Sequence, residues 1–194
     1  MQSLPPIDEL SGLTESANLP FPWLISARRL LHSAYLLDKE SQHGEPYKDV
    51  RNVARMCMGM AIECYFKAFY VSVGNVLHDG KKQKTFGAHD LTEMADGVGF
   101  VVTPEQRKVL YYLSMWVKVK GRYPVPLRLD DMKIHESDEA ENPFSPHLLV
   151  WDDSSDERCM ELVREAENRI AALRNCGLTI HSSGLPSAAA DFKR

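Results

Sequence analysis

Apolar residues recur at three- and four-residue spacing in several separate stretches of the chain, a pattern that predicts amphipathic helices. No stretch carries a convincing strand pattern. The first helix is expected after Pro22, and its apolar stripe consists of Leu24, Ala27, Leu30, Leu31, Ala34 and Leu37. The second helix, residues 49–73, is apolar around much of its circumference, which favours a central position with neighbours on several sides.

The second half of the chain predicts three more helices. A short helix begins near His89-Asp90 and closes at Gly99. The segment 103–120 opens with a threonine, a proline in the first turn and a glutamine three residues later, which together predict a capping box. A last helix is expected from a cap at Ser154 or Ser155 to Gly177.

The segment 122–153 interrupts this series of helices. It contains four prolines and many acidic residues without a sustained period, so a long irregular loop is expected there. The sequence thus predicts an all-α fold, an up-and-down bundle of about five mostly antiparallel helices. We expect an N-terminal arm over 1–20, a helical domain over 21–181 and a flexible tail over 182–194.

Composition narrows the class of protein. The 194 residues are 44% hydrophobic and 26% charged, with a formal net charge of −4, so no global basic field attracts nucleic acid. The N-terminus lacks the pattern of a signal peptide, and no apolar run reaches the length of a membrane span. The four cysteines have no CxxC spacing, which favours reduced thiols in a cytoplasmic protein without membrane contact.

Three short segments, taken in order, resemble the HEPN domain family. These are an apolar helix that contains Lys67, a helix entry at His89-Asp90-Leu91, and Arg122-Tyr123-Pro124 after the next long helix. The resemblance implies a helical bundle associated with nucleotides or RNA, in a prokaryotic defence, toxin–antitoxin or stress system. It also implies a homodimer and, as in many relatives, a nucleotidyltransferase partner protein.

Ribonucleases of this family carry an arginine followed by a polar residue, with a histidine about four to six positions further on. Two degenerate matches occur here, Arg128 with His135 and Arg174 with His181, each with six residues between. Such a pair can stabilise a phosphorane and move a proton during attack by a 2′-hydroxyl. No clear motif is present, so a protein without strong hydrolytic activity is expected. A metal-independent endoribonuclease and a ligand-free dimeric interaction module are the alternatives.

Candidate ligand-binding residues lie near two helix ends. Arg122 and Tyr123 can satisfy helix carbonyls or the acidic loop, or can face a phosphate. Three loop lysines, which are either solvated or hold phosphates, complete the candidate patch: Lys81, Lys82 and Lys84.

The remaining polar motifs have structural interpretations. At the start of the short helix, His89 and Asp90 are expected mainly to cap it. Glu63 and Lys67 have the spacing of an intrahelical ion pair. We expect no cofactor and no metal, because acidic and histidine residues lack helical ligand spacing and no glycine-rich phosphate motif occurs.

Overall fold

The computed structural model describes residues 12, 14–41, 50–79, 84, 89–120 and 153–175. The fold is all-α, and no strand occurs in this part of the chain. The elements in order are the helices α2 (Pro20–Ser41), α3 (Arg51–Ser72), α4 (Leu91–Val98), α5 (Pro104–Met115), the π-helical turn η3 (Trp116–Lys120) and α7 (Asp153–Asn175).

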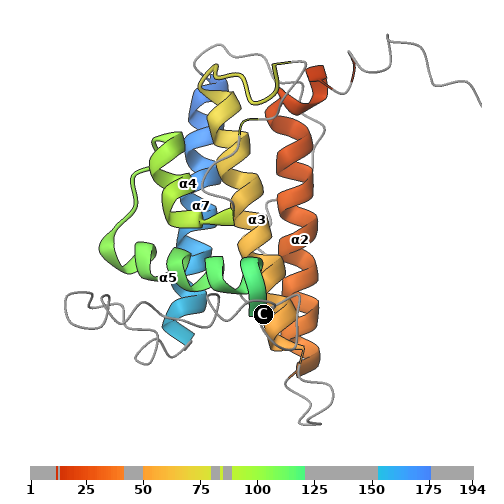
Figure 1. Ribbon diagram of the computed structural model, residues 1–194, viewed down its shortest axis with the longest axis vertical. Coiled ribbons are helices and arrows are strands. Elements are labelled where there is room, and N and C mark those ends of the chain that lie inside the picture. Colours follow the sequence, from red (N-terminus) through yellow and green to blue (C-terminus); the bar gives the residue numbers. More distant parts are fainter. Residues whose placement is uncertain are drawn as a thin grey trace, which may run out of the picture.

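Three long helices, α2, α3 and α7, stand side by side (Figure 1). Helix α3 runs antiparallel to α2, whereas α7 runs in the same direction as α3 (Figure 1). Helix α5 lies across the lower part of these helices rather than along them. The expected up-and-down, mostly antiparallel order therefore holds for α2 and α3 but is wrong for α5 and α7.

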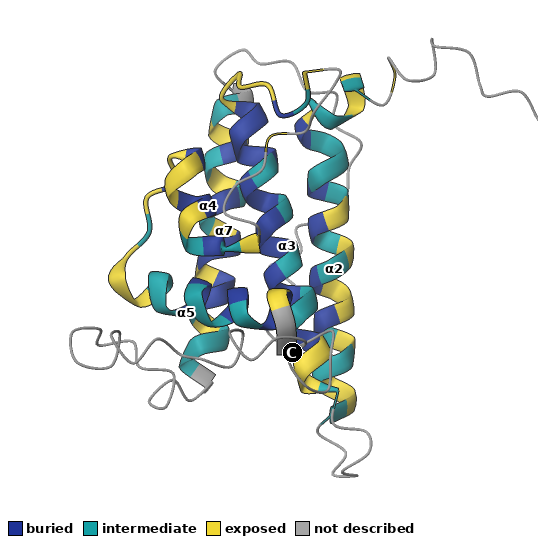
Figure 2. Ribbon diagram, viewed as in Figure 1, coloured by how far each residue is buried: buried dark blue, intermediate teal, exposed yellow. Residues whose placement is uncertain are grey.

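The prediction of a central α3 is confirmed. This helix contacts α2, α4, α5, η3 and α7, and its buried positions face every side of the helix (Figure 2). Gly59 makes one of these contacts possible, because a Cβ atom there would lie 2.5 Å from Cγ2 of Val117 in η3. An apolar surface that surrounds a helix is stabilised only when neighbours cover all of it.

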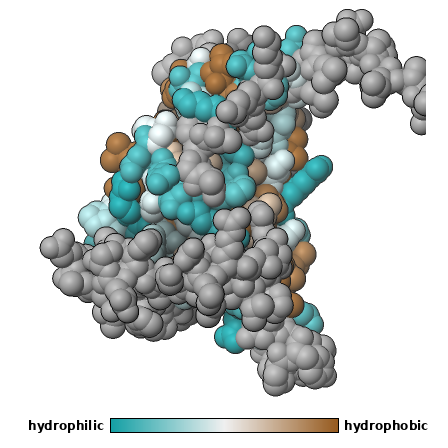
Figure 3. All heavy atoms as spheres, viewed as in Figure 1, coloured by the Kyte–Doolittle hydropathy of each residue, from teal (hydrophilic) through white to brown (hydrophobic). Residues whose placement is uncertain are grey.

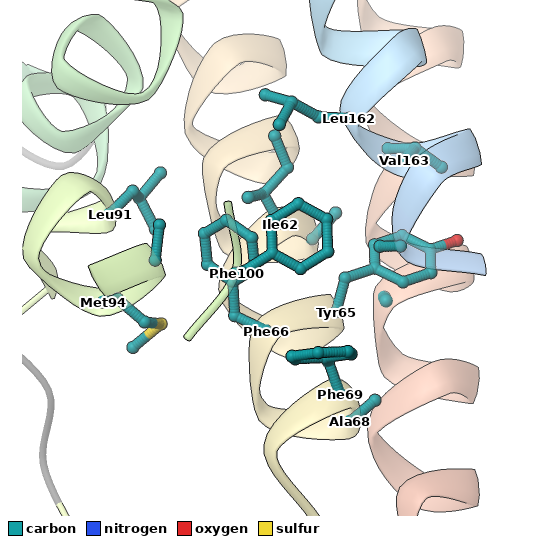
Figure 4. Packing of buried hydrophobic residues seen from close by; sticks show 14 of the residues in the cluster. Ile62, Tyr65, Phe66, Ala68, Phe69, Leu91, Met94, Phe100, Leu162 and Val163 are labelled. Atoms are coloured by element: carbon teal, nitrogen blue, oxygen red, sulfur yellow. The ribbon is translucent and has the colours of Figure 1, made fainter. Parts of the chain in front are cut away.

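Aromatic side chains fill the core beside α3 (Figure 4). Phe100, in the segment that follows α4, lies between Phe66 and Phe69, with ring centroids 5.1 and 5.4 Å away. These tilted and edge-on arrangements are the favoured geometries of aromatic pairs. Leu91 and Met94 on α4 and Leu162 and Val163 on α7 are buried in the same cluster, so α3 connects the two sides of the core.

Apart from α2, which begins at Pro20 and not after Pro22, helix ends follow the sequence closely, with one exception. Thr103 accepts a hydrogen bond from the Gln106 amide, and the Gln106 side chain accepts one from Thr103, which confirms the capping box. Gly74 and Gly99 end α3 and α4 at positive φ angles of 86° and 72°. The exception is α7, which already includes Asp153, so a cap at Ser154 or Ser155 is wrong.

The N-terminal arm is not extended throughout. Residues 14–17 are helical, and the side chain of Asn18 accepts hydrogen bonds from the amides of Leu77 and His78. The same side chain donates to the His78 carbonyl at 2.7 Å. This link anchors the residues before α2 to the segment after α3. In the described part of the chain, no helix combines the length and the apolar character of a membrane span.

Candidate functional site

A buried carboxylate on α3 organises the most distinctive polar cluster. The side chain of Glu63 is only 11% exposed. One of its oxygens accepts a hydrogen bond from Nζ of Lys67 at 2.7 Å, and the other lies 2.8 Å from Nδ1 of His89. Glu63 thus joins α3 to the residue that precedes the cap of α4. We call Glu63, Lys67 and His89 the His89 cluster.

Opposing effects act on the charge of Glu63. Burial alone would raise the pKa of this carboxyl, but hydrogen bonds from His89 and Lys67 outweigh burial and hold its pKa below the ordinary value. The carboxyl is therefore ionised at neutral pH. Lys67 also lies 4.9 Å from the ring centroid of Trp23 on α2, a cation–π contact that fixes the lysine against the bundle.

The imidazole of His89 is partly exposed to solvent. Its side chain is 46% exposed although Nδ1 contacts the buried Glu63. An ionised carboxylate can only accept a hydrogen bond, so the neutral imidazole carries its proton on Nδ1 and an unprotonated Nε2. The backbone of His89 has a φ of 74°, the only positive φ at a non-glycine residue in the described part. Such conformations cost about 1–3 kcal/mol and often mark functional sites.

Asp90 completes this corner as the N-cap of α4. Its Oδ1 accepts hydrogen bonds from the amides of Thr92 and Glu93, which confirms the capping prediction for Asp90. Its Oδ2 lies 2.8 Å from Nζ of Lys118 in η3. Burial would raise the pKa of Asp90, but the hydrogen bonds from Lys118 and Thr92 lower it. His89 does not cap the helix, so the capping interpretation fails for that residue.

The arrangement allows a limited set of reactions. A carboxylate-held imidazole can accept a proton or act as a nucleophile at Nε2, and it can bind an anion when it is protonated. A metal site has no support, because the described residues hold no cluster of three acidic, histidine or cysteine ligands. The three described cysteines, Cys57, Cys64 and Cys159, are free thiols.

The structure describes only part of the predicted site. Lys84 donates a hydrogen bond to the hydroxyl of Tyr70 and lies over its ring. Tyr70 follows Glu63 by seven residues, about 10 Å along α3, and the contacts of Lys84 with Tyr70 are distinct from those of the His89 cluster. The backbone of Arg174 belongs to α7, but its side chain lies outside the described part. The other predicted residues lie wholly outside it: Arg122, Tyr123, Arg128, His135, His181, Lys81 and Lys82.

Sequence reasoning missed the role of Glu63. The ion pair between Glu63 and Lys67 is confirmed, but it is only half of the interaction, because His89 contacts the other oxygen. A glutamate inside an otherwise apolar helix was the available signal, since a buried carboxylate requires partners from more than its own helix.

A second buried carboxylate connects the three long helices. Glu167 on α7 accepts hydrogen bonds from Nε of Arg28 on α2 and from the hydroxyl of Tyr65 on α3, both at 3.0 Å. Burial raises the pKa of Tyr65, so this phenol stays protonated and donates. We call Glu167, Arg28 and Tyr65 the Glu167 cluster, and its geometry is that of a structural link.

A shallow hollow of about 540 Å³ separates residues 101–103 from α7. Its rim carries two acidic and two basic side chains, Glu161, Arg164, Glu165 and Arg169, so its charges balance. Arg169 is already engaged with Glu165, with the Val101 carbonyl and with the ring of Phe100. The hollow therefore has neither a net charge nor a buried carboxylate, and we do not choose it as the site.

Comparison of the chain with protein-family models, with curated proteins and with solved structures found no match. The functional argument consequently depends on the residues of this chain.

Proposed function

We propose that this chain is a HEPN-like helical module that associates with RNA or a nucleotide in a prokaryotic defence, toxin–antitoxin or stress system, without strong hydrolytic activity. One observation carries the proposal. Lys67, His89 and Lys118, from three segments that are distant in sequence, gather around two carboxylates at one corner of the bundle. Two of the resembling segments, those with Lys67 and with His89, meet here, and Lys118 lies four residues before Arg122 in the sequence.

The charges of this corner predict weak, electrostatic binding. Lys67 and Lys118 are each paired with a carboxylate, so the group is close to neutral when His89 is unprotonated. Few phosphates can then be neutralised. For one or two phosphates of a single strand, the logarithm of the binding constant should fall against the logarithm of salt concentration with a slope of about −0.7 to −1.4.

Anisotropy of a fluorescein-labelled single-stranded RNA, titrated with the protein in EDTA at several salt concentrations, tests the proposal. Lys118→Gln should weaken binding and reduce the salt slope by about 0.7, and His89→Gln should also weaken binding. Lys39→Gln and His32→Gln, which change exposed residues of α2, are the matched controls. Equal binding by all variants, or no binding by the wild type, would contradict the proposal.

The same samples test the endoribonuclease alternative. RNA recovered after the titration should remain intact on a denaturing gel. If the wild type shortens the RNA and His135→Ala or His181→Ala does not, the protein is a metal-independent endoribonuclease and our proposal is wrong. Shortened RNA that disappears only in His89→Gln would assign the hydrolysis to the His89 cluster instead.

We propose a cytoplasmic homodimer, with a nucleotidyltransferase as a further partner protein. Among the coloured residues in the view of Figure 3, hydrophobic residues stand apart from one another, so they do not mark the dimer surface. Scattered apolar residues are normal on a monomer surface. Light scattering over a range of protein concentrations measures the mass, and a monomer at every concentration would refute the dimer.

A further inference from the structure

The unprotonated nitrogen of His89 is the starting point. Glu63 Oε2 lies 2.8 Å from Nδ1, and because Glu63 is ionised, the proton of the neutral ring belongs to Nδ1. Nε2 then carries a lone pair. With 46% of the side chain exposed, the ring combines a buried, oriented edge with contact to solvent. An imidazole held in this way is an activated nucleophile.

The carboxylate that holds the ring is itself fixed. Glu63 lies on the central helix, and its second oxygen is bonded to Lys67, which in turn contacts Trp23. When a group bonds to Nε2, the ring becomes cationic at Nδ1–H. A neighbouring ionised carboxylate stabilises that cation, as a carboxylate does for an imidazolium in a catalytic triad.

The amides at the start of α4 are not available to bind an anion. The side chain of Asp90 accepts hydrogen bonds from the amides of Thr92 and Glu93, and the hydroxyl of Ser114 accepts one from the amide of Leu91. The reactive feature of this corner is therefore the histidine nitrogen, with the ammonium groups of Lys67 and Lys118 as the nearby positive charges.

We propose that His89 is a phosphoryl acceptor that is modified at Nε2 by a donor of the phosphoramidate class. The Nε2 lone pair attacks phosphorus, and the bond from phosphorus to the nitrogen leaving group breaks. The leaving nitrogen, which is protonated in the donor, departs as the neutral amine with that electron pair. The proton of His89 stays on Nδ1 and remains hydrogen-bonded to Glu63. No oxidation occurs. This inference goes beyond the proposed function and does not require RNA binding.

Inorganic phosphoramidate and the full-length protein provide the test, with intact mass and site mapping at mildly alkaline pH as the readouts. His89 should gain one phosphoryl group about ten- to a hundredfold faster than His32, an exposed histidine of the same molecule. This range is taken by analogy from metal sites, where loss of the carboxylate that holds a histidine costs about ten- to a hundredfold in affinity or activity. Phosphorus NMR should show the Nε2 isomer. Glu63→Gln should reduce the rate at His89 and leave His32 unchanged.

Each outcome is decisive. Equal rates at His89 and His32, or modification at Nδ1, would overturn the inference. Both are measured on the wild type, so the test does not depend on whether Glu63→Gln folds. His89→Gln should lose only the rapid phosphorylation that we assign to His89. If rapid phosphorylation remains in this variant, it belongs to another residue. RNA binding without phosphorylation refutes this inference alone, and phosphorylation without RNA binding refutes only the proposed function.

Discussion

Glu63 and Glu167 are two carboxylates of nearly equal side-chain exposure that have different partners. Their side chains are 11% and 13% exposed, and each accepts hydrogen bonds from one cation and one neutral donor. The neutral donor differs. Glu167 is bonded to Tyr65, which lies within the core, whereas Glu63 is bonded to His89, which stands half in solvent on a left-handed backbone. The two carboxylates therefore differ in the exposure of their partners rather than in their own burial, and this difference is what separates the proposed site from the structural link.

The largest effect is expected from Glu167→Ala, which tests the structural half of the comparison. Its removal leaves Arg28 and the buried Tyr65 hydroxyl without this acceptor, at a cost of about 3 kcal/mol in the free energy of unfolding. Glu165→Ala on the same helix is the control. That residue is 46% exposed and pairs with Arg169, so its loss should cost about 0.5 kcal/mol. Urea unfolding measures both, and equal losses would contradict a structural role for Glu167.

Glu63→Gln should have an intermediate effect that depends on pH. At neutral pH the loss of charge-assisted hydrogen bonds should cost about 2 kcal/mol. The folded-state pKa of Glu63 lies below its ordinary value of 4.5, so its stabilisation is complete above that pH and is lost as pH falls through the folded-state pKa. The difference between wild type and variant, measured by urea unfolding, should therefore shrink on acidification. A difference that is constant down to acidic pH would show that the Glu63 charge does not stabilise the fold.

The sequence predicted the faces and ends of the helices better than it predicted these two clusters. Apolar spacing placed α3 at the centre, and the residues at 90 and 103 marked two helix starts, because periodicity and caps are local signals. Glu63 and His89 are 26 residues apart, and Tyr65 and Glu167 are 102 apart. Their meeting depends on how helices pack. The left-handed backbone at residue 89 could not be predicted from the sequence, because that position is a histidine and not a glycine.

The smallest effect comes from removing the two neutral donors. Tyr65→Phe takes a hydroxyl from Glu167 at a residue that is almost completely buried, and should cost about 1.5 kcal/mol. His89→Asn takes an imidazole from Glu63 at a half-exposed position, where water can bind the freed oxygen, and asparagine tolerates the left-handed backbone. Its cost in urea unfolding should be about 0.5 kcal/mol. So small a cost, at a residue whose backbone conformation itself costs energy, would favour a role for His89 other than stabilising the fold. If His89→Asn instead cost as much as Tyr65→Phe, His89 would be a structural link like its counterpart, and the distinction between the two carboxylates would fail.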